Sequence, residues 1–377
     1  MRITLSSEGE SGALLDVLVV GGGQAGLALG HHLRRTSLRF LIVDAAPEVG
    51  HVWRTRYDSL RLFTPAKRDA LPGLPFPGNP EHYPSKDEVA DYLTEYVRVF
   101  HLPLRLGVRV TALAASGGGY AAETSAGILW ARQVVVATGP FGTPWVPDFA
   151  RHFSLPQLHS SAYRRPTQLP PGRILVVGSG NSGAQIAEEL TLTHEVTLAL
   201  GRPQPFLPQR VLSRDVFDWA EKVPLFDAPV TAPLGHLLRW WDPVIGTNAQ
   251  ALARRGRLTL RPRADGGVGH TVHFQDGSAA VFDGVVWATG YRPDYGWLHV
   301  PVLDDQGRPR HARGVTAAPG LYFLGLSWQH TRRSALLGGV REDAAFIARR
   351  VEADHRDRAG RPLKVGLGPG KSGSRTR

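Results

Sequence analysis

Two stretches of the chain carry the glycine spacing of nucleotide-binding loops. Residues 16–26 read DVLVVGGGQAG and residues 173–183 read RILVVGSGNSG. In the pattern G-x-G-x-x-G the first glycine permits a tight turn, the second lets the backbone approach a pyrophosphate, and the third lets a helix pack closely on a strand. The phosphates then face a helix N-terminus, which favours negative charge. The glycines are Gly21, Gly23 and Gly26 in the first stretch and Gly178, Gly180 and Gly183 in the second. The other candidate cofactor-binding residues of these loops are Gln24, Ala25, Asn181 and Ser182.

The residue that ends the second strand of each unit indicates which dinucleotide binds. In the first unit, FLIVDAA places Asp44 where a carboxylate accepts hydrogen bonds from ribose hydroxyls and repels a 2′-phosphate. The same offset from Gly178 leads to Gly201, which is followed by Arg202. A guanidinium matches a phosphate through a fork of charged donors. The second unit therefore predicts NADPH, with a solvated loop residue as the alternative interpretation of Arg202.

Two dinucleotides on one chain predict electron transfer between them. A nicotinamide needs a hydride acceptor, and a flavin, here FAD, is the usual one. The chain has no cysteine, which excludes a redox-active disulfide, a thiolate metal site and a cysteine nucleophile. Its fifteen histidines show no metal-binding spacing, so no metal site is expected. The electrons must pass to dioxygen, a small molecule or a separate protein.

The elements that position the loops predict an α/β fold. Each loop joins an apolar, β-branched strand to a helix, as expected for parallel strands buried on both faces. A capping box at Ser85 and Glu88 opens an amphipathic helix over 85–100. The expected strands are 16–20, 38–43, 104–114, 119–124, 128–136, 173–177 and 195–200, and the helices flanking the loops are 24–35 and 181–190.

The stretches VVVATGP (134–140) and GVVWATGYRPD (284–294) match each other and set the domain organisation. We expect two dinucleotide-binding, Rossmann-like domains, with the NADPH domain inserted into the FAD domain. The expected division is 1–165 and 285–365 for FAD, 166–284 for NADPH with an excursion over 203–250, and a disordered basic tail over 366–377.

Composition limits the partners of this 377-residue chain. The formal net charge is +11, but the arginines are scattered without an aromatic platform, so no nucleic-acid partner is expected. No apolar run approaches the roughly 18 residues of a membrane span, so stable membrane insertion is not expected. Without an export signal, we expect a cytoplasmic protein.

Beyond the two loops, residues 48–93 (EVGHVWRTRYDSLRLFTP…PFPGNPEHYPSKDEVADYL) and both ATG strands resemble class B flavin-dependent monooxygenases. CzcO-like bacterial proteins and plant YUCCA-type enzymes are the most similar groups. The family motif F-x-G-x-x-x-H-x-x-x-[YF] falls on FSLPQLHSSAY (153–163), where Leu155 replaces the glycine. Phe63 stands near the position of an asparagine in animal flavin monooxygenases, which YUCCA-type sequences also lack.

The resemblance implies further site residues. Trp53 and Arg54 would lie near the flavin, and the segment 321–348 would close the flavin site. The remaining residues that the resemblance implies as cofactor-binding are Thr138, Gly139, Thr289, Gly290, Gln329 and Leu337.

The resemblance also implies a reaction. NADPH would reduce FAD, which would activate O₂ as a C4a-(hydro)peroxyflavin and oxygenate a small organic substrate. No side chain stands out as an indispensable acid or base. The alternatives are an NADPH–flavin reductase or oxidase and a non-catalytic nucleotide-sensing regulator. The sequence identifies no substrate and leaves a homodimer open.

Overall fold

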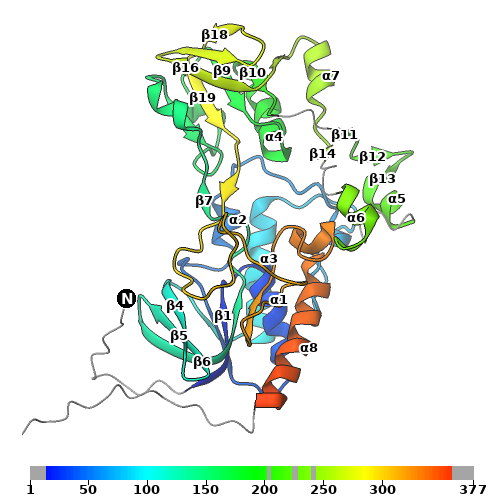
Figure 1. Cartoon of the computed structure of the whole chain (residues 1–377). Coiled ribbons are helices and arrows are strands. Elements are labelled where there is room, and N and C mark those ends of the chain that lie inside the picture. The colour runs from blue at the N-terminus through cyan, green and yellow to red at the C-terminus, as the bar shows by residue number, and fades with distance from the viewer. Residues whose placement is uncertain (1–13, 202–204, 223–227, 239–242, 359–377) are drawn as a thin grey trace, which may run out of the picture.

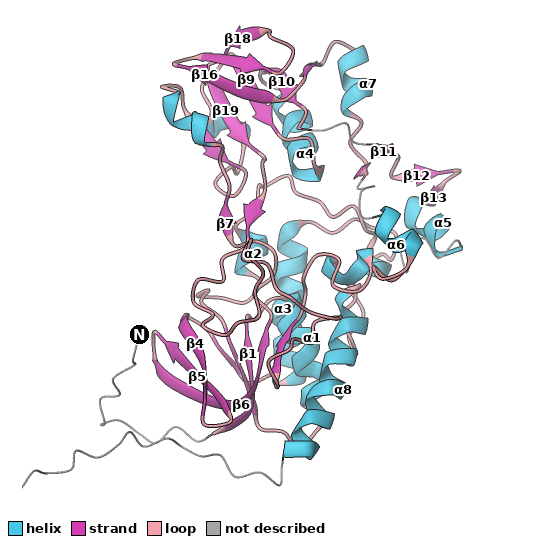
Figure 2. Cartoon of the chain, in the orientation of Figure 1, coloured by secondary structure: helices cyan, strands magenta, loops and turns pink. Residues whose placement is uncertain are grey.

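The computed structural model describes residues 14–201, 205–222, 228–238 and 243–358. They form two units, each built on a largely parallel sheet with helices packed against it, and the units lie end to end (Figures 1 and 2). The expected mixed α/β architecture is therefore confirmed. Within these ranges no helix is both long and apolar enough to cross a membrane.

The first sheet has the strand order β3-β2-β1-β6-β5-β4, and β21 also pairs with β6. β3, β2, β1, β6 and β21 run parallel, whereas β4, β5 and β6 form an antiparallel meander. The strands of this sheet are β1 (Leu15–Val20), β2 (Phe40–Val43), β3 (Leu104–Arg105), β4 (Val110–Ser116), β5 (Gly119–Thr124), β6 (Gly127–Val136) and β21 (Leu321–Phe323).

Strand β1 is buried on both faces of the sheet. Helices cover one face, and the segment around Leu298 covers the other. Val17 and Val19 pack in a cluster with α1, α3 and α8, while Leu18 and Val20 face a second cluster that includes Leu298. Burial on both faces explains the unbroken apolar run in β1. The helices of this unit are α1 (Gln24–Leu33), α2 (His51–Arg54), α3 (Lys86–Phe100) and α8 (Val340–Arg358).

The predicted start of α3 is confirmed. Ser85 accepts a hydrogen bond from the Glu88 N–H, and the Glu88 side chain accepts one from the Ser85 N–H. Both predicted loop helices are also present, although α1 ends at Leu33 rather than at residue 35.

The second sheet is entirely parallel, with the order β15-β10-β9-β19-β8. α4 and α7 pack on one face; the small antiparallel sheet β16-β17-β18 and the segment around Phe153 pack on the other. The elements of this unit are β8 (Gln157–His159), β9 (Arg173–Val177), α4 (Asn181–Leu190), β10 (Glu195–Ala199), α7 (Ala249–Arg254), β15 (Leu258–Arg261), β16 (Ala264–Val268), β17 (Thr271–Phe274), β18 (Ala279–Val281) and β19 (Gly284–Trp287).

Two chain crossings connect the units and run side by side. β7 (Thr143–Pro144) leaves the first unit and pairs antiparallel with β20 (Tyr291–Arg292), which returns to it. β8 already pairs in the second sheet, so this sheet takes up the chain before residue 166.

The excursion between β10 and α7 extends from the second unit to the first (Figure 1). Its Phe217 stacks on Phe63, and the Gln209 side chain donates to the Phe63 carbonyl over 2.8 Å. The described elements of the excursion are β11 (Phe206–Leu207), β12 (Arg210–Val211), β13 (Arg214–Asp215), α5 (Val216–Lys222), α6 (Pro233–Leu238) and β14 (Val244–Ile245). The short 3-10 helices of the chain are η1 (Ala66–Arg68), η2 (Asp148–His152), η3 (Pro166–Gln168) and η4 (Arg332–Ala335).

Candidate functional site

The first glycine loop is tightly packed at its ends and open in its middle. Gly21 has φ +113°, and a Cβ there would lie 2.4 Å from the Ala137 carbonyl oxygen. A Cβ on Gly26 would lie 1.9 Å from the Gly21 oxygen, whereas one on Gly23 would meet nothing within 4 Å. The outer glycines are therefore required by packing, and the middle one leaves room for a ligand.

The second loop repeats this geometry. Gly178 has φ +109°, and a Cβ there would lie 2.3 Å from the Ala288 carbonyl oxygen. A Cβ on Gly183 would lie 1.9 Å from the Gly178 oxygen, and one on Gly180 would meet nothing within 4 Å. In both units the alanine of an ATG segment closes against the first glycine, so the loop and the segment form one structural device.

Both loops present an uncapped helix N-terminus. Gly23 and Gly180 are the N-cap residues of α1 and α4; neither helix has a side-chain cap bond or an acidic residue in its first turn. The first backbone N–H groups of a helix have no intrahelical acceptor. Together with the open space at the middle glycines, they fit the pyrophosphate of a dinucleotide.

Asp44 lies at the end of β2 with both carboxylate oxygens engaged. Oδ2 accepts the Gly22 N–H over 2.6 Å, and Oδ1 accepts the Ala46 N–H over 2.7 Å. A carboxylate has about four lone-pair sites, so these two bonds leave capacity for ribose hydroxyls. The bond from Gly22 also holds the glycine loop against the end of β2.

A cavity of about 1080 Å³ opens beside this loop. Four predicted residues line it: Gly21, Asp44, Thr138 and Gly139. It continues to Phe141 and Tyr291 at the crossings between the units. The other lining residues include His51, Val52, Arg109, Tyr295, Trp297, His311 and Ser327.

Trp53 and Arg54 do not line this cavity; their neighbours His51 and Val52 do. Trp53 packs against the core cluster of the first unit. Arg54 donates to Asp91 over 2.7 Å and pairs with Glu48 over 3.6 Å. The short helix α2 thus turns these two side chains away from the cavity.

The two ATG segments meet the crossings between the units. Thr138 interacts with the Tyr295 hydroxyl, and burial raises the pKa of Tyr295 to about 12. Thr289 donates to the Trp145 carbonyl, and the Gly290 carbonyl accepts the Trp145 N–H over 2.9 Å. The second segment is therefore fastened to the outgoing crossing.

His159 of the family motif is hydrogen-bonded to the Gly290 carbonyl. Its Nε2 lies 3.0 Å from the Gly290 oxygen, and its Nδ1 lies 3.1 Å from the Ser161 nitrogen. A carbonyl only accepts and a backbone N–H only donates, so the proton is on Nε2. Burial lowers the pKa of His159, which keeps the ring neutral.

The other motif positions are structural in the same way. The Tyr163 hydroxyl donates to Glu189 over 2.8 Å, and Phe153 stacks on Trp287. Leu155, which replaces the motif glycine, is 3 % exposed and packs in the same core cluster as Phe153. The substitution therefore adds core contact rather than disturbing the turn.

The remaining predicted residues stabilise the loops or the core. Asn181 accepts the Ile245 N–H over 2.9 Å, which joins α4 to the excursion. Ser182 interacts with the Tyr57 hydroxyl, which also contacts Gln185. Gln24 and Ala25 form the first turn of α1, and Leu337 lies in the core of the first unit. Gln329 is buried and accepts the Leu326 N–H over 3.2 Å.

A second cavity of about 440 Å³ lies at the ends of β10 and β15. Gly201 lines it, whereas Arg202 lies outside the described residues, so no contact can be assigned to it. Two arginines that the sequence analysis missed, Arg261 and Arg263, line it as well. The sequence pattern that could have pointed to these two arginines is RLTLRPR (257–263), a strand segment that ends in arginines.

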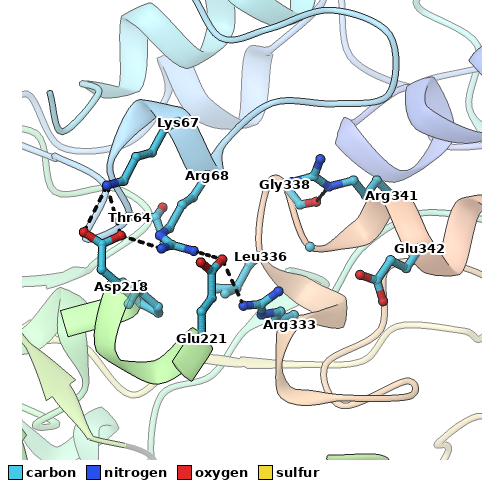
Figure 3. A pocket seen from close by; sticks show the side chains of 12 residues that line it. Thr64, Lys67, Arg68, Asp218, Glu221, Arg333, Leu336, Gly338, Arg341 and Glu342 are labelled. Atoms are coloured by element: carbon cyan, nitrogen blue, oxygen red, sulfur yellow. Dashed lines mark hydrogen bonds and ion pairs between the residues drawn. The ribbon is translucent and has the colours of Figure 1, made fainter. Parts of the chain in front are cut away.

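A third cavity of about 360 Å³ lies between the first unit and the excursion (Figure 3). Lys67, Arg68 and Arg333 point toward Asp218 and Glu221 of α5. The pairs include Lys67–Asp218 at 2.9 Å and Arg333–Glu221 at 3.6 Å. The ion pairs hold α5 against the first unit.

The described ranges contain no cluster of three or more His, Cys, Asp or Glu side chains suited to a metal ion. The arrangement instead provides two glycine loops with open middle positions, a large cavity beside one and a smaller cavity beside the other.

Comparison with known proteins agrees with this geometry. A family model described as pyridine nucleotide-disulphide oxidoreductase matches residues 18–211. An uncharacterized CzcO-like oxidoreductase of Geobacillus kaustophilus (strain HTA426) is 44% identical over 338 residues, which are 89% of this chain and 97% of that protein. Indole-3-pyruvate monooxygenase YUCCA1 of Oryza sativa subsp. japonica is 29% identical over 90% of this chain and 92% of its own length.

A solved structure extends the comparison. A flavin-containing monooxygenase from Stenotrophomonas maltophilia superimposes with a TM-score of 0.77 at 30% identity, over 90% of this chain and 98% of that one. The expected resemblance is thus confirmed. The chain belongs to the pyridine nucleotide-disulphide oxidoreductase family, and within it to the CzcO-like oxidoreductases related to class B flavin-dependent monooxygenases.

Proposed function

We propose that the protein is an NADPH-dependent, FAD-containing monooxygenase that acts on a small organic substrate. One observation carries this proposal: each unit contains an open glycine loop packed against an ATG segment. A large cavity lies beside this arrangement in the first unit and a smaller cavity in the second. The flavin monooxygenases among its relatives support the same reading.

The first unit holds FAD in this proposal. The open space at Gly23 and the N-terminus of α1 receive the pyrophosphate, and Asp44 accepts hydrogen bonds from the adenosine ribose. The cavity from Asp44 to Tyr291 accommodates the rest of the cofactor and leads toward the crossings.

The second unit holds NADPH in the corresponding loop at Gly180. We propose that the domain division follows the two sheets, so the second domain begins at β8 and ends at β19. His159, by holding the Gly290 carbonyl, fixes the segment where the two cofactors would meet.

Bound FAD supplies hydride acceptance and oxygen activation. The chain's own contribution in this proposal is to bind and orient the cofactors and to exclude water. The absence of cysteine excludes an internal disulfide as electron acceptor, unlike the disulphide chemistry in the family's name.

The test is to purify the protein, measure flavin content, and follow oxygen consumption and H₂O₂ release with NADPH across carbonyl and soft-nucleophile substrates. We expect bound FAD and, with a true substrate, consumption of oxygen that exceeds peroxide release. Gly180→Ala serves as the matched control, because it should keep the flavin and lose reduction by NADPH.

Two outcomes contradict the proposal. If all consumed oxygen appears as H₂O₂ with every substrate, the protein is an oxidase. A colourless protein that takes up no FAD is not a flavoenzyme.

A further inference from the structure

Arg56 of the first unit contacts both chain crossings beside the large cavity. We propose that Arg56 is a positioning residue for the reduction of FAD by NADPH, an inference that rests on the proposed function. It acts through Tyr291 and Phe141, by holding the two units in the relative placement that hydride transfer requires.

The Arg56 side chain is half-buried and lies between two aromatic rings. Its Nη1 donates a hydrogen bond to the Tyr291 hydroxyl of β20, the returning crossing. Its guanidinium carbon lies 4.4 Å from the ring centroid of Phe141, which precedes β7, and 5.4 Å from that of Tyr291. The negative face of an aromatic ring attracts a cation, so this one side chain binds both crossings.

Tyr291 carries the contact on to the second unit. Its ring meets the edges of two neighbours, with 5.2 Å between the ring centroids for Phe141 and also 5.2 Å for His159. His159 belongs to β8 of the second sheet and holds the Gly290 carbonyl. Arg56 is therefore linked through Tyr291 to the second sheet and to its ATG segment.

The aromatic rings are the principal partners of the Arg56 charge. Among the described residues no Asp or Glu side chain lies within ion-pair distance of Arg56, whereas Arg54, two residues earlier, pairs with Asp91 over 2.7 Å. Phe141 is 52 % exposed, so packing covers only part of its ring. Removal of the guanidinium would leave these rings without the group that fastens them to the first unit.

These contacts lie where the two cofactors meet in the proposed function. Asp44 binds the adenosine ribose of FAD there, and Phe141 and Tyr291 line the same cavity at the crossings. In the reduction step a C–H bond of the nicotinamide breaks with its electron pair, so that NADPH becomes NADP⁺ and FAD becomes FADH⁻. The reacting atoms must lie about 3–3.5 Å apart, and a misplacement of about 1 Å can slow a reaction roughly 100-fold.

The test separates binding of the cofactors from their placement. Flavin-loaded wild type, Arg56→Ala, Arg56→Lys and Tyr291→Phe are mixed anaerobically with increasing NADPH, and the loss of flavin absorbance is followed by stopped flow. The limiting rate reports placement, and the NADPH concentration that gives half this rate reports affinity. Reduction by dithionite, which needs no NADPH, verifies that the flavin itself is reducible.

Arg165→Ala is the matched control. Arg165 also joins the two units, through an exposed ion pair with Asp58 at 3.7 Å, but it lies away from the crossings. An exposed ion pair contributes little to stability, so this variant should be reduced at the wild-type rate.

We expect Arg56→Ala to lower the limiting rate about 10- to 100-fold, with unchanged NADPH affinity and flavin content. Arg56→Lys keeps the cation without the planar fork and should restore part of the loss. Tyr291→Phe removes only the hydrogen-bond acceptor and should have a smaller effect. The double variant Arg56→Ala/Tyr291→Phe should be no slower than Arg56→Ala, because both changes remove the same contact.

The positioning role is overturned if Arg56→Ala reaches the wild-type limiting rate, or if its defect lies in NADPH affinity or flavin content. An equal loss in Arg165→Ala overturns it as well, because any weakened contact between the units would then suffice. Melting temperatures verify folding; if Arg56→Ala does not fold, Arg56→Lys and Tyr291→Phe decide by the same criteria. In each of these cases, reduction of the wild type by NADPH still supports the proposed function. Wild-type protein whose flavin NADPH does not reduce overturns both.

Discussion

The two units share the backbone geometry of their glycine loops but differ in the side chains beside these loops. In each, an ATG alanine packs on the first glycine and the middle glycine stays open. The first unit then places a carboxylate at the end of its second strand, hydrogen-bonded to its own loop. The second places Leu200 there, not the Gly201 expected from the sequence offset, because its Ala199 pairs with Val177 as Val43 pairs with Val20. Arg263 from the neighbouring strand binds the carbonyl of the next residue, Gly201. The two units thus share a backbone arrangement and differ in the side chain that follows the second strand, a carboxylate in one and an apolar side chain in the other.

The strongest way to break this comparison is to add a methyl group at the third glycine of each unit. Gly26→Ala and Gly183→Ala would each place a Cβ 1.9 Å from a carbonyl oxygen, so backbone must shift. We expect each to cost about 3 kcal/mol of folding free energy. Gly26→Ala should lose the flavin, whereas Gly183→Ala should retain it and lose reduction by NADPH.

Flavin absorbance, thermal melting and anaerobic reduction by NADPH measure these effects. Equal flavin loss in both variants would show that the two loops are not functionally separate.

The middle glycines test ligand space without the clash. Among the described residues, apart from chain neighbours, a Cβ at Gly23 or Gly180 meets nothing within 4 Å. We expect Gly23→Ala and Gly180→Ala to change folding stability by less than about 1 kcal/mol, since the backbone there is not left-handed. Nucleotide affinity in the matching unit should nevertheless fall, by about 100-fold, because the added methyl group occupies the pyrophosphate position.

Titration of the apoprotein with FAD, and of the holoprotein with NADPH, measures the two losses separately. Unchanged affinity in either variant would mean that the phosphates bind elsewhere.

A smaller change places a carboxylate beyond the end of β10 in the second unit. Gly201→Asp introduces a carboxylate where Arg263 donates to the backbone, and among the described residues beyond its chain neighbours nothing lies within 4 Å of the new Cβ. The added charge should repel the 2′-phosphate and raise the KM for NADPH about tenfold, while the KM for NADH stays unchanged or falls. Steady-state reduction with both cofactors tests this, and Gly201→Asn is the uncharged control. A similar loss in the asparagine variant would indicate a steric effect.

The last prediction concerns the buried carboxyl of Asp69, near the contact between the first unit and the excursion. Burial raises the pKa of Asp69 to about 8, although Thr64 donates to it over 2.6 Å. The native state keeps this proton up to that pH, whereas an unfolded aspartate loses it near pH ~4. The unfolded state therefore binds fewer protons between these values, so stability falls as pH rises through this window.

Asp69→Asn removes that titration. Between pH 5 and pH 8, the melting temperature of Asp69→Asn should rise relative to that of the wild type. The expected rise is about 2–4 °C for each kcal/mol of folding stability that ionisation of Asp69 costs the wild type. Asp305→Asn, at a fully exposed position, is the control and should show no such trend. Parallel pH profiles for Asp69→Asn and the wild type would contradict a buried proton at this site.

The sequence predicted most of what depends on local pattern. Both glycine loops, their helices, the capping box at Ser85 and the parallel strands follow from spacing and apolar runs. Arg263 was missed because only the pairing of β15 with β10 brings it to Gly201. The expectation that Trp53 and Arg54 lie near the flavin stays a prediction. The side chains that α2 presents to the cavity are those of His51 and Val52, and which side of a short helix faces a cavity depends on packing.

The path of the chain through β6 has a consequence for folding order. The C-terminal half of β6 pairs with β21, whose Leu321 lies opposite Val134, and the whole second sheet is encoded between them. During synthesis the second unit is complete before β21 and α8 emerge, so it can fold first as a nearly continuous stretch. The paired crossings β7 and β20 then hold the two parts of the first unit together, and we expect the pairing of β6 with β21 to complete that unit afterwards. The unit whose first residues are synthesised earliest is thus the unit whose folding is completed last.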